Sequence, residues 1–126
     1  MFELSKQFRF EAAHTLKRSV DGEASRRIHG HSYRAEVVVR GDADPSTGMV
    51  IDFGLLERAL EDARRGLDHH FLNEVPDLGP PTMENLSLWI WRKVSPACSG
   101  IARVIVYRDS SGEMCSCFGP LNEGAT

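Results

Sequence analysis

Residues 29–40 read HGHSYRAEVVVR, and this stretch decides the fold. From residue 31 to residue 40, the apolar positions 33, 35, 37 and 39 alternate with positions 34, 36 and 38, which is the period of a β-strand with one buried face. Side chains two residues apart on a strand point the same way, so His29 and His31 present their imidazoles side by side. The stretch predicts a half-buried strand that begins with two candidate metal ligands.

A third histidine, His14, follows the alternating run FRFEAA at residues 8–13. This run predicts another strand over residues 2–14. If the two strands pair antiparallel, three neutral imidazole nitrogens converge on one point. Three protein ligands with an open fourth position are typical of a catalytic zinc site rather than a structural one. The alternative is that the His-Gly-His sequence forms a loop with solvent-exposed histidines.

Two helical segments come after this pair of strands. Asp52 is a suitable N-cap for a helix whose apolar residues recur at helical spacing until Gly66. Thr82 opens a second helix with the same kind of apolar stripe, and Pro96 ends it. Both helices are therefore predicted to pack one face against a core.

Two final strands, residues 102–108 and 114–118, flank the turn at residues 109–112, whose sequence is DSSG. The order is β-β-α-α-β-β, with a polar connection at residues 17–27 between the first two strands. This order predicts the α+β class, with two helices on one face of an antiparallel sheet. A four-stranded sheet has unpaired edges, which favours closure by oligomerisation.

The composition is that of an ordinary domain: 126 residues with 15 basic and 18 acidic side chains, a formal net charge of −3. We expect a single domain over residues 1–120 and a short polar tail over residues 121–126. The sequence contains no block of basic residues of the kind that would indicate a nucleic acid or a membrane surface as a partner. No apolar run has the length needed to span a bilayer.

The three cysteines, Cys98, Cys115 and Cys117, are an odd number and do not have the pattern of a disulfide framework. We therefore expect reduced thiols. The first residues, MFELSK, lack the charged-then-apolar layout of a secretion signal. Both observations indicate a cytoplasmic protein.

Five motifs along the chain belong together. They read FEAAH at residues 10–14, IHGHSY at 28–33, GMVIDF at 48–53, LDHHFLN at 67–73 and PTMENL at 81–86. In this order and at this spacing they resemble the 6-pyruvoyltetrahydropterin synthase family. The similarity is greatest to its bacterial branch, the 6-carboxytetrahydropterin synthases of queuosine biosynthesis.

The resemblance implies the tunnelling fold, in which antiparallel strands of several subunits form a barrel ringed by helices. It also implies a homohexamer of two trimers with active sites between subunits. The implied activity is that of a lyase acting on the small molecule dihydroneopterin triphosphate. The implied cofactor is Zn²⁺, bound by the histidines that match the family's ligands, His14, His29 and His31.

The family moves protons with a cysteine and an Asp-His pair, and the pair matches Asp68 and His69. A carboxylate bonded to one imidazole nitrogen fixes the tautomer and raises the basicity of the other nitrogen. The position of the family's cysteine, four residues before the first histidine of His-Gly-His, is Ser25 here. A serine hydroxyl is a much weaker acid than a thiol and needs a strong partner. Glu23 is a second candidate base in the same connection.

The substrate contacts implied by the resemblance show a second departure. Family members place a glutamate after the third strand, where it binds the donor edge of the pterin, but this chain has Arg108. An arginine carries only donors and suits a carboxylate or phosphate instead. Asp109 would reach the ligand only through a bulge. Thr82 and Glu84 remain as further candidate ligand contacts.

These departures leave three hypotheses open. The first is a zinc-dependent lyase for a reduced pterin triphosphate or a close relative. The second is a zinc enzyme of the same fold for a different, anionic substrate held by Arg108. The third is a non-catalytic protein that retains the fold and the metal for stability.

Overall fold

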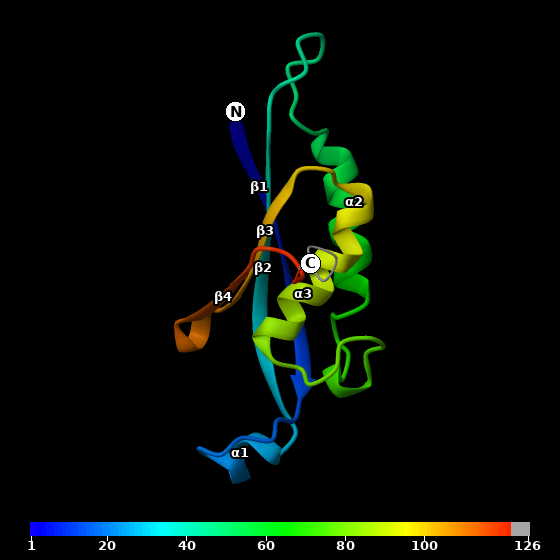
Figure 1. Ribbon diagram of the computed structural model, residues 1–126. Coiled ribbons are helices and arrows are strands. Elements are labelled where there is room, and N and C mark those ends of the chain that lie inside the picture. The colour runs from blue at the N-terminus through cyan, green and yellow to red at the C-terminus, as the bar shows by residue number, and fades with distance from the viewer. Residues whose placement is uncertain (122–126) are drawn as a thin grey trace.

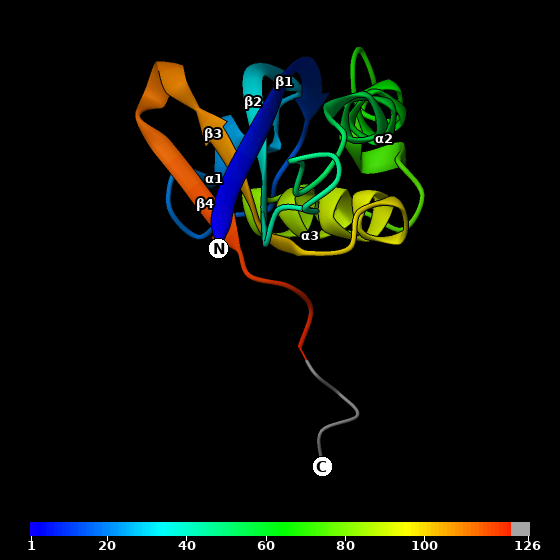
Figure 2. The same ribbon diagram turned by 90° about the horizontal axis from the view of Figure 1, so that it is seen from above.

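A computed structural model describes residues 1–121 of the chain. Its sheet contains four antiparallel strands in the order β1 (Phe2–His14), β2 (His29–Gly41), β3 (Ile101–Arg108) and β4 (Glu113–Cys117). The two longer helices, α2 (Phe53–Arg65) and α3 (Met83–Val94), cover one face of this sheet (Figures 1 and 2). The predicted α+β arrangement is confirmed.

The connection between β1 and β2 contains a short helix, α1 (Gly22–Arg26), in a stretch that the sequence indicates only as polar. This helix lies at the end of the long β1–β2 hairpin (Figure 1). Three single-turn 3₁₀ helices complete the described chain: η1 (Leu72–Glu74), η2 (Ser95–Ala97) and η3 (Asp109–Ser111). The predicted tail falls mostly on residues 122–126, which lie outside the described residues.

The β1–β2 hairpin pairs continuously from Phe2↔Gly41 to His14↔His29. The even-numbered side chains of β1 face the helices. Among them Phe10 is buried and stacks on Tyr33 of β2, with ring centroids 4.8 Å apart. Because the pairing is unbroken, side chains continue to alternate between the two faces of the sheet from the core to the end of the hairpin, where the histidines lie.

The helices form where the sequence predicts them. The Asp52 carboxylate caps α2 by accepting from the Gly54 amide at 2.7 Å, and the Thr82 hydroxyl caps α3 by accepting from the Asn85 amide at 3.2 Å. After α2, Gly66 lies so close to α3 that a Cβ there would be 2.7 Å from Cη2 of Trp89. The absence of a side chain at this position therefore permits the close packing of the two helices.

The face of the sheet opposite the helices is mainly charged, with one difference from the sequence pattern. Val38 falls in the polar register of β2 but is only 1% exposed, as is Ile105 of β3. Polar contacts surround them, including a hydrogen bond of 2.9 Å from the Tyr107 hydroxyl to the Glu36 carboxylate. No helix among residues 1–121 is long and apolar enough to cross a membrane.

Candidate metal centre and catalytic dyad

The three histidines of the sequence pattern meet at the end of the β1–β2 hairpin. His14 lies directly opposite His29 in the strand register, and His31 opposes Ala12 two residues along. The Nε2 atom of His14 is 3.0 Å from Nε2 of His29 and 3.1 Å from Nε2 of His31. Their ligand atoms all lie within 4.8 Å of one another. The strand pairing thus converts two short motifs into one cluster.

Two backbone carbonyls determine which ring nitrogens carry hydrogen. Nδ1 of His14 lies 3.1 Å from the Pro81 carbonyl, and Nδ1 of His29 lies 2.8 Å from the Arg27 carbonyl. A carbonyl only accepts, so each Nδ1 is the donor and each Nε2 keeps its lone pair. These lone pairs point into the cluster.

Burial favours the neutral form of two of the three histidines, His14 and His31. His14 is 1% exposed, and burial lowers its pKa. Burial, followed by the charge of His14, lowers the pKa of His31 to about 4. Neutral imidazoles are the form that binds metals.

The arrangement fits a divalent metal ion. Nitrogen lone pairs about 3 Å apart repel one another unless a cation or a shared proton lies between them. A tetrahedral ion with metal–nitrogen distances of about 2.0–2.1 Å requires nitrogens about 3.3 Å apart. The two separations from Nε2 of His14, 3.0 and 3.1 Å, are close to this value. The residues that can hold the ion are therefore His14, His29 and His31.

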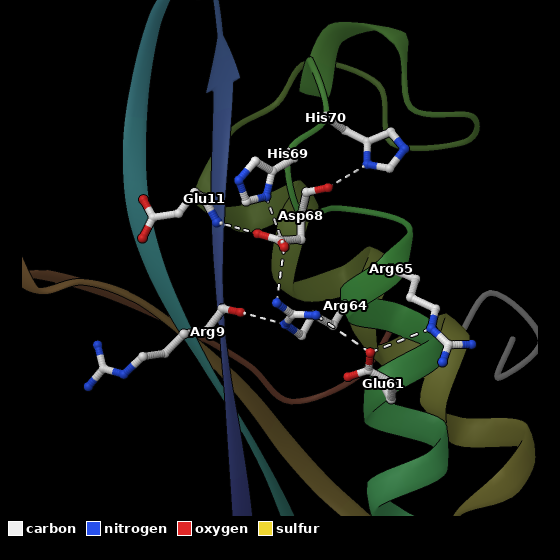
Figure 3. Close-up of polar contacts among 8 residues, drawn as sticks. All are labelled: Arg9, Glu11, Glu61, Arg64, Arg65, Asp68, His69 and His70. Atoms are coloured by element: carbon white, nitrogen blue, oxygen red, sulfur yellow. Dashed lines mark hydrogen bonds and ion pairs between the residues drawn. The ribbon is translucent and has the colours of Figure 1, made fainter.

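Asp68 and His69, the predicted proton-transfer pair, lie between the end of α2 and β1 (Figure 3). Oδ2 of Asp68 lies 3.0 Å from Nδ1 of His69 and 3.0 Å from Nη2 of Arg64. Oδ1 accepts from the Glu11 amide at 2.9 Å. This amide, together with His69 and Arg64, lowers the pKa of Asp68 although its partial burial acts in the opposite direction. The carboxylate is ionised and fixed in place.

The backbone also fixes His69. Its φ of 59° is in the left-handed region, and its amide donates to the Glu11 carbonyl at 2.6 Å. This conformation is uncommon for residues other than glycine and costs about 1–3 kcal/mol. With Nδ1 on Asp68, the free Nε2 belongs to a side chain that is 79% exposed. His69 and His31 line the same pocket, of about 430 Å³, so the dyad and the histidine cluster each contribute one residue to its lining.

A second pocket of about 380 Å³ lies beside His14 and brings together three predicted substrate contacts, Thr82, Glu84 and Arg108. Nη1 of Arg108 is 3.4 Å from Nε2 of His31, and its Nη2 is 2.8 Å from the Glu113 carboxylate. Glu113 was not recognised from the sequence. Its signal is the turn at residues 109–112, which places it directly opposite Arg108 in the β3–β4 register.

The remaining predicted site residues lie elsewhere. Asp109 is in η3 and accepts two hydrogen bonds of 3.0 Å from Arg34. Glu23 is exposed and pairs with Arg27 at 3.2 Å. Ser25 is buried, and its carbonyl accepts from the Leu16 amide at 2.8 Å. None of the three lines either of the pockets beside the histidines.

The family model for 6-pyruvoyl tetrahydropterin synthase matches residues 3–120. The chain belongs to this family. The resemblance seen in the five motifs is therefore confirmed, and the match extends over almost the whole chain. The family is one of pterin synthases and lyases.

Individual relatives show how varied these enzymes are. This chain is 40% identical over 102 residues to 6-carboxy-5,6,7,8-tetrahydropterin synthase of Synechocystis sp.. The match spans 77% of this chain and 78% of the relative. This chain is also 38% identical over 85 residues to dihydroneopterin monophosphate aldolase of Pyrococcus furiosus, 68% of each chain. The reaction therefore differs among relatives of comparable similarity.

The fold agrees with solved structures of the family. The structure of Caenorhabditis elegans 6-pyruvoyl tetrahydropterin synthase superposes with a TM-score of 0.80 at 22% identity, over 94% of this chain and 96% of that one. The agreement shows that this chain has the predicted tunnelling fold.

Proposed function

We propose that this protein is a zinc-dependent lyase that acts on dihydroneopterin triphosphate or a closely related compound. The observation that carries the proposal is the convergence of the imidazole nitrogens of His14, His29 and His31, together with a pocket that His31 lines jointly with His69 of the Asp68–His69 dyad. The curated relatives, two of them named as pterin synthase and pterin aldolase, support the reaction class.

The roles of the residues follow from their geometry. A zinc ion held by His14, His29 and His31 would act as a Lewis acid that acidifies protons next to the substrate's side-chain oxygens. His69 would take up such a proton at Nε2, because Asp68 keeps the hydrogen on Nδ1 at 3.0 Å. Arg64 and the Glu11 amide keep Asp68 ionised and oriented for this task.

The second proton-transfer group is proposed to be Ser25, which occupies the position of the family's cysteine. Ser25 is buried, whereas the alternative, Glu23, is exposed and paired with Arg27. A Ser25→Ala variant tests this role, because turnover should fall while the metal content stays unchanged. Ser25→Cys should restore or raise turnover.

The strong exposure of His69 also supports assembly. An efficient proton carrier works best where water is excluded, yet this side chain is 79% exposed in the single chain. We infer a homohexamer in which neighbouring subunits cover the pocket. Sedimentation of the purified protein tests the assembly.

The experiment that tests the function combines metal analysis with turnover. The purified protein should contain one zinc per chain and convert dihydroneopterin triphosphate to a product identified by mass spectrometry. His29→Ala should lose both properties, whereas His70→Ala should keep the metal, because His70 bonds the Asp68 carbonyl and lies outside the cluster. Metal-replete protein without turnover would exclude this substrate.

A further inference from the structure

Arg108 lies at the inner end of the second pocket in an unusual setting for a cation. It ends β3 on the helix-facing side, two residues after the buried Val106, and its side chain is only 15% exposed. Nη2 is paired with Glu113 at 2.8 Å, and Nη1 contacts the histidine cluster at His31. Its Nε is buried and has no partner among residues 1–121.

The contact with His31 cannot coexist with a metal ion in the cluster. Nε2 of His31 has one lone pair, and that lone pair either accepts from Arg108 or binds a metal. A metal-loaded cluster therefore leaves both Nη1 and Nε of Arg108 without a hydrogen-bond acceptor among residues 1–121. Buried donors of this kind cost about 1–3 kcal/mol when unsatisfied. A ligand acceptor would remove this cost.

The charge of the pocket points the same way. Two further basic side chains, Lys17 and Arg18, line it together with Arg108, whereas Glu84 and Glu113 are its only carboxylates among the described lining residues. The Ser111 hydroxyl and then the charges of Arg108 and Arg18 lower the pKa of Glu113, so this carboxylate is already engaged. The lining has a net positive formal charge before any metal is added.

We propose that Arg108, with Lys17 and Arg18 at the same pocket, forms an oxyanion-binding subsite, and that the natural ligand places a carboxylate or phosphate group on the Arg108 guanidinium. This inference rests on the proposed function, since it names the class of substrate that the same site takes. The guanidinium presents donors only and carries a full positive charge, so an anionic oxygen is the acceptor that suits its free donors. A ligand edge made of donors would face the cation without an acceptor.

The test measures binding and does not require turnover. Benzoate, its uncharged isostere benzamide and inorganic phosphate are titrated calorimetrically into zinc-loaded and into chelator-treated protein at low salt. We expect at least one of the two anions to bind, more tightly in the zinc-loaded protein, and benzamide not to bind. Arg108→Met should weaken anion binding about 10- to 100-fold, the loss expected for a charge-assisted hydrogen bond of about 1.5–3 kcal/mol.

Arg103→Met is the matched control. Arg103 lies on the same strand but faces the opposite side of the sheet, where it pairs with Glu3 at 3.8 Å. It should retain wild-type anion affinity, and Arg108→Lys should give an intermediate affinity because a charge remains without the planar pair of donors. Preference for benzoate would identify a carboxylate, and preference for phosphate a phosphate ester.

The proposal is overturned if neither anion binds, if benzamide binds as well as benzoate, or if Arg108→Met and Arg103→Met have the same affinity. The last result would mean that the anion binds the metal or the general field of the protein. Because binding is measured apart from catalysis, failure to turn over a pterin triphosphate would refute the proposed function and leave the subsite intact. Conversely, turnover of a pterin triphosphate by a protein that binds neither anion would refute the subsite and leave the proposed function intact.

Discussion

Replacement of Asp68 by asparagine changes the dyad with little change in shape, and its effects can be worked out atom by atom. The carbonyl oxygen of the new side chain can still accept from the Glu11 amide, which is 2.9 Å from Oδ1 of Asp68. The amide nitrogen, however, replaces Oδ2, which accepts from both His69 and Arg64 at 3.0 Å (Figure 3). Two donors then face an NH₂ group.

The imidazole responds by changing its tautomer. His69 can accept from the new NH₂ only with a bare Nδ1, which places its hydrogen on Nε2. The nitrogen proposed to take up the substrate proton is then already protonated. Loss of a positioned general base typically costs 10²- to 10⁴-fold in rate, so we expect kcat to fall by about 10²- to 10⁴-fold. The metal content should not change, because the histidine cluster does not include Asp68.

The stability effect is smaller. His69 is 79% exposed and Arg64 is 38% exposed, so water can replace much of what each donor loses. We expect a loss of about 1–2 kcal/mol in the free energy of unfolding, below the full value of two buried charged hydrogen bonds. Urea unfolding measures the free energy of unfolding. Steady-state turnover measures kcat, and metal analysis measures the metal content.

Glu61→Gln is the control for the general electrostatics of the cluster. Glu61 pairs with Arg64 and Arg65 at 3.5 Å in each case and is not paired with His69 (Figure 3). It should leave kcat within about twofold of the wild type, since exposed ion pairs contribute about 0.2–1 kcal/mol. The reasoning is refuted if Asp68→Asn folds, binds metal and keeps wild-type kcat, or if Glu61→Gln loses as much activity.

Three further predictions concern the metal and the packing. Zinc at about 100 times its Kd should stabilise the protein by about 2.7 kcal/mol in thermal unfolding, and His29→Ala should abolish this increase; an increase that persists would place the ion elsewhere. Because the folded pKa of His31 is lowered from 6.5 to about 4, the unfolded chain takes up protons first, so the metal-free protein should lose stability as the pH falls from about 6.5 to about 4. Thermal melts across this range should show a shallower decline for His31→Gln, and an equal slope would contradict the assignment. Gly66→Ala should lower the free energy of unfolding by about 1–3 kcal/mol through overpacking, because the new Cβ would be 2.7 Å from Trp89. An unchanged midpoint of urea unfolding would show that α3 moves away without a loss of stability.

The parts of the structure that could be predicted from sequence are those set by local periodicity. The alternation over residues 31–40 predicted β2, and the spacing of His29 and His31 predicted two imidazoles on one face. The caps Asp52 and Thr82 marked the starts of α2 and α3. In each case the neighbouring residues in the chain contain the information.

The features that the sequence did not reveal depend on contacts between distant segments. Val38 has the register of an exposed residue but is only 1% exposed, although it lies on the face of the sheet opposite α2 and α3 (Figure 2). Asp109 is adjacent to Arg108 in the chain, yet its carboxylate pairs with Arg34 of another strand. Glu113 became visible as a site residue only when the β3–β4 register placed it against Arg108. The burial of Val38 and the Asp109–Arg34 pair depend on segments far apart in the chain, whereas the Arg108–Glu113 pair is signalled locally by the turn at residues 109–112.

The unbroken ladder from Phe2↔Gly41 to His14↔His29 has a consequence for how the chain tolerates changes in length. Deletion of a single residue within β1 would turn every later side chain of that strand, His14 included, to the opposite face, and the His14 imidazole would no longer share a direction with those of His29 and His31. Insertions in the connection at residues 15–28, by contrast, leave that alignment untouched. Tolerance to insertion should therefore rise abruptly immediately after His14 and fall again at His29.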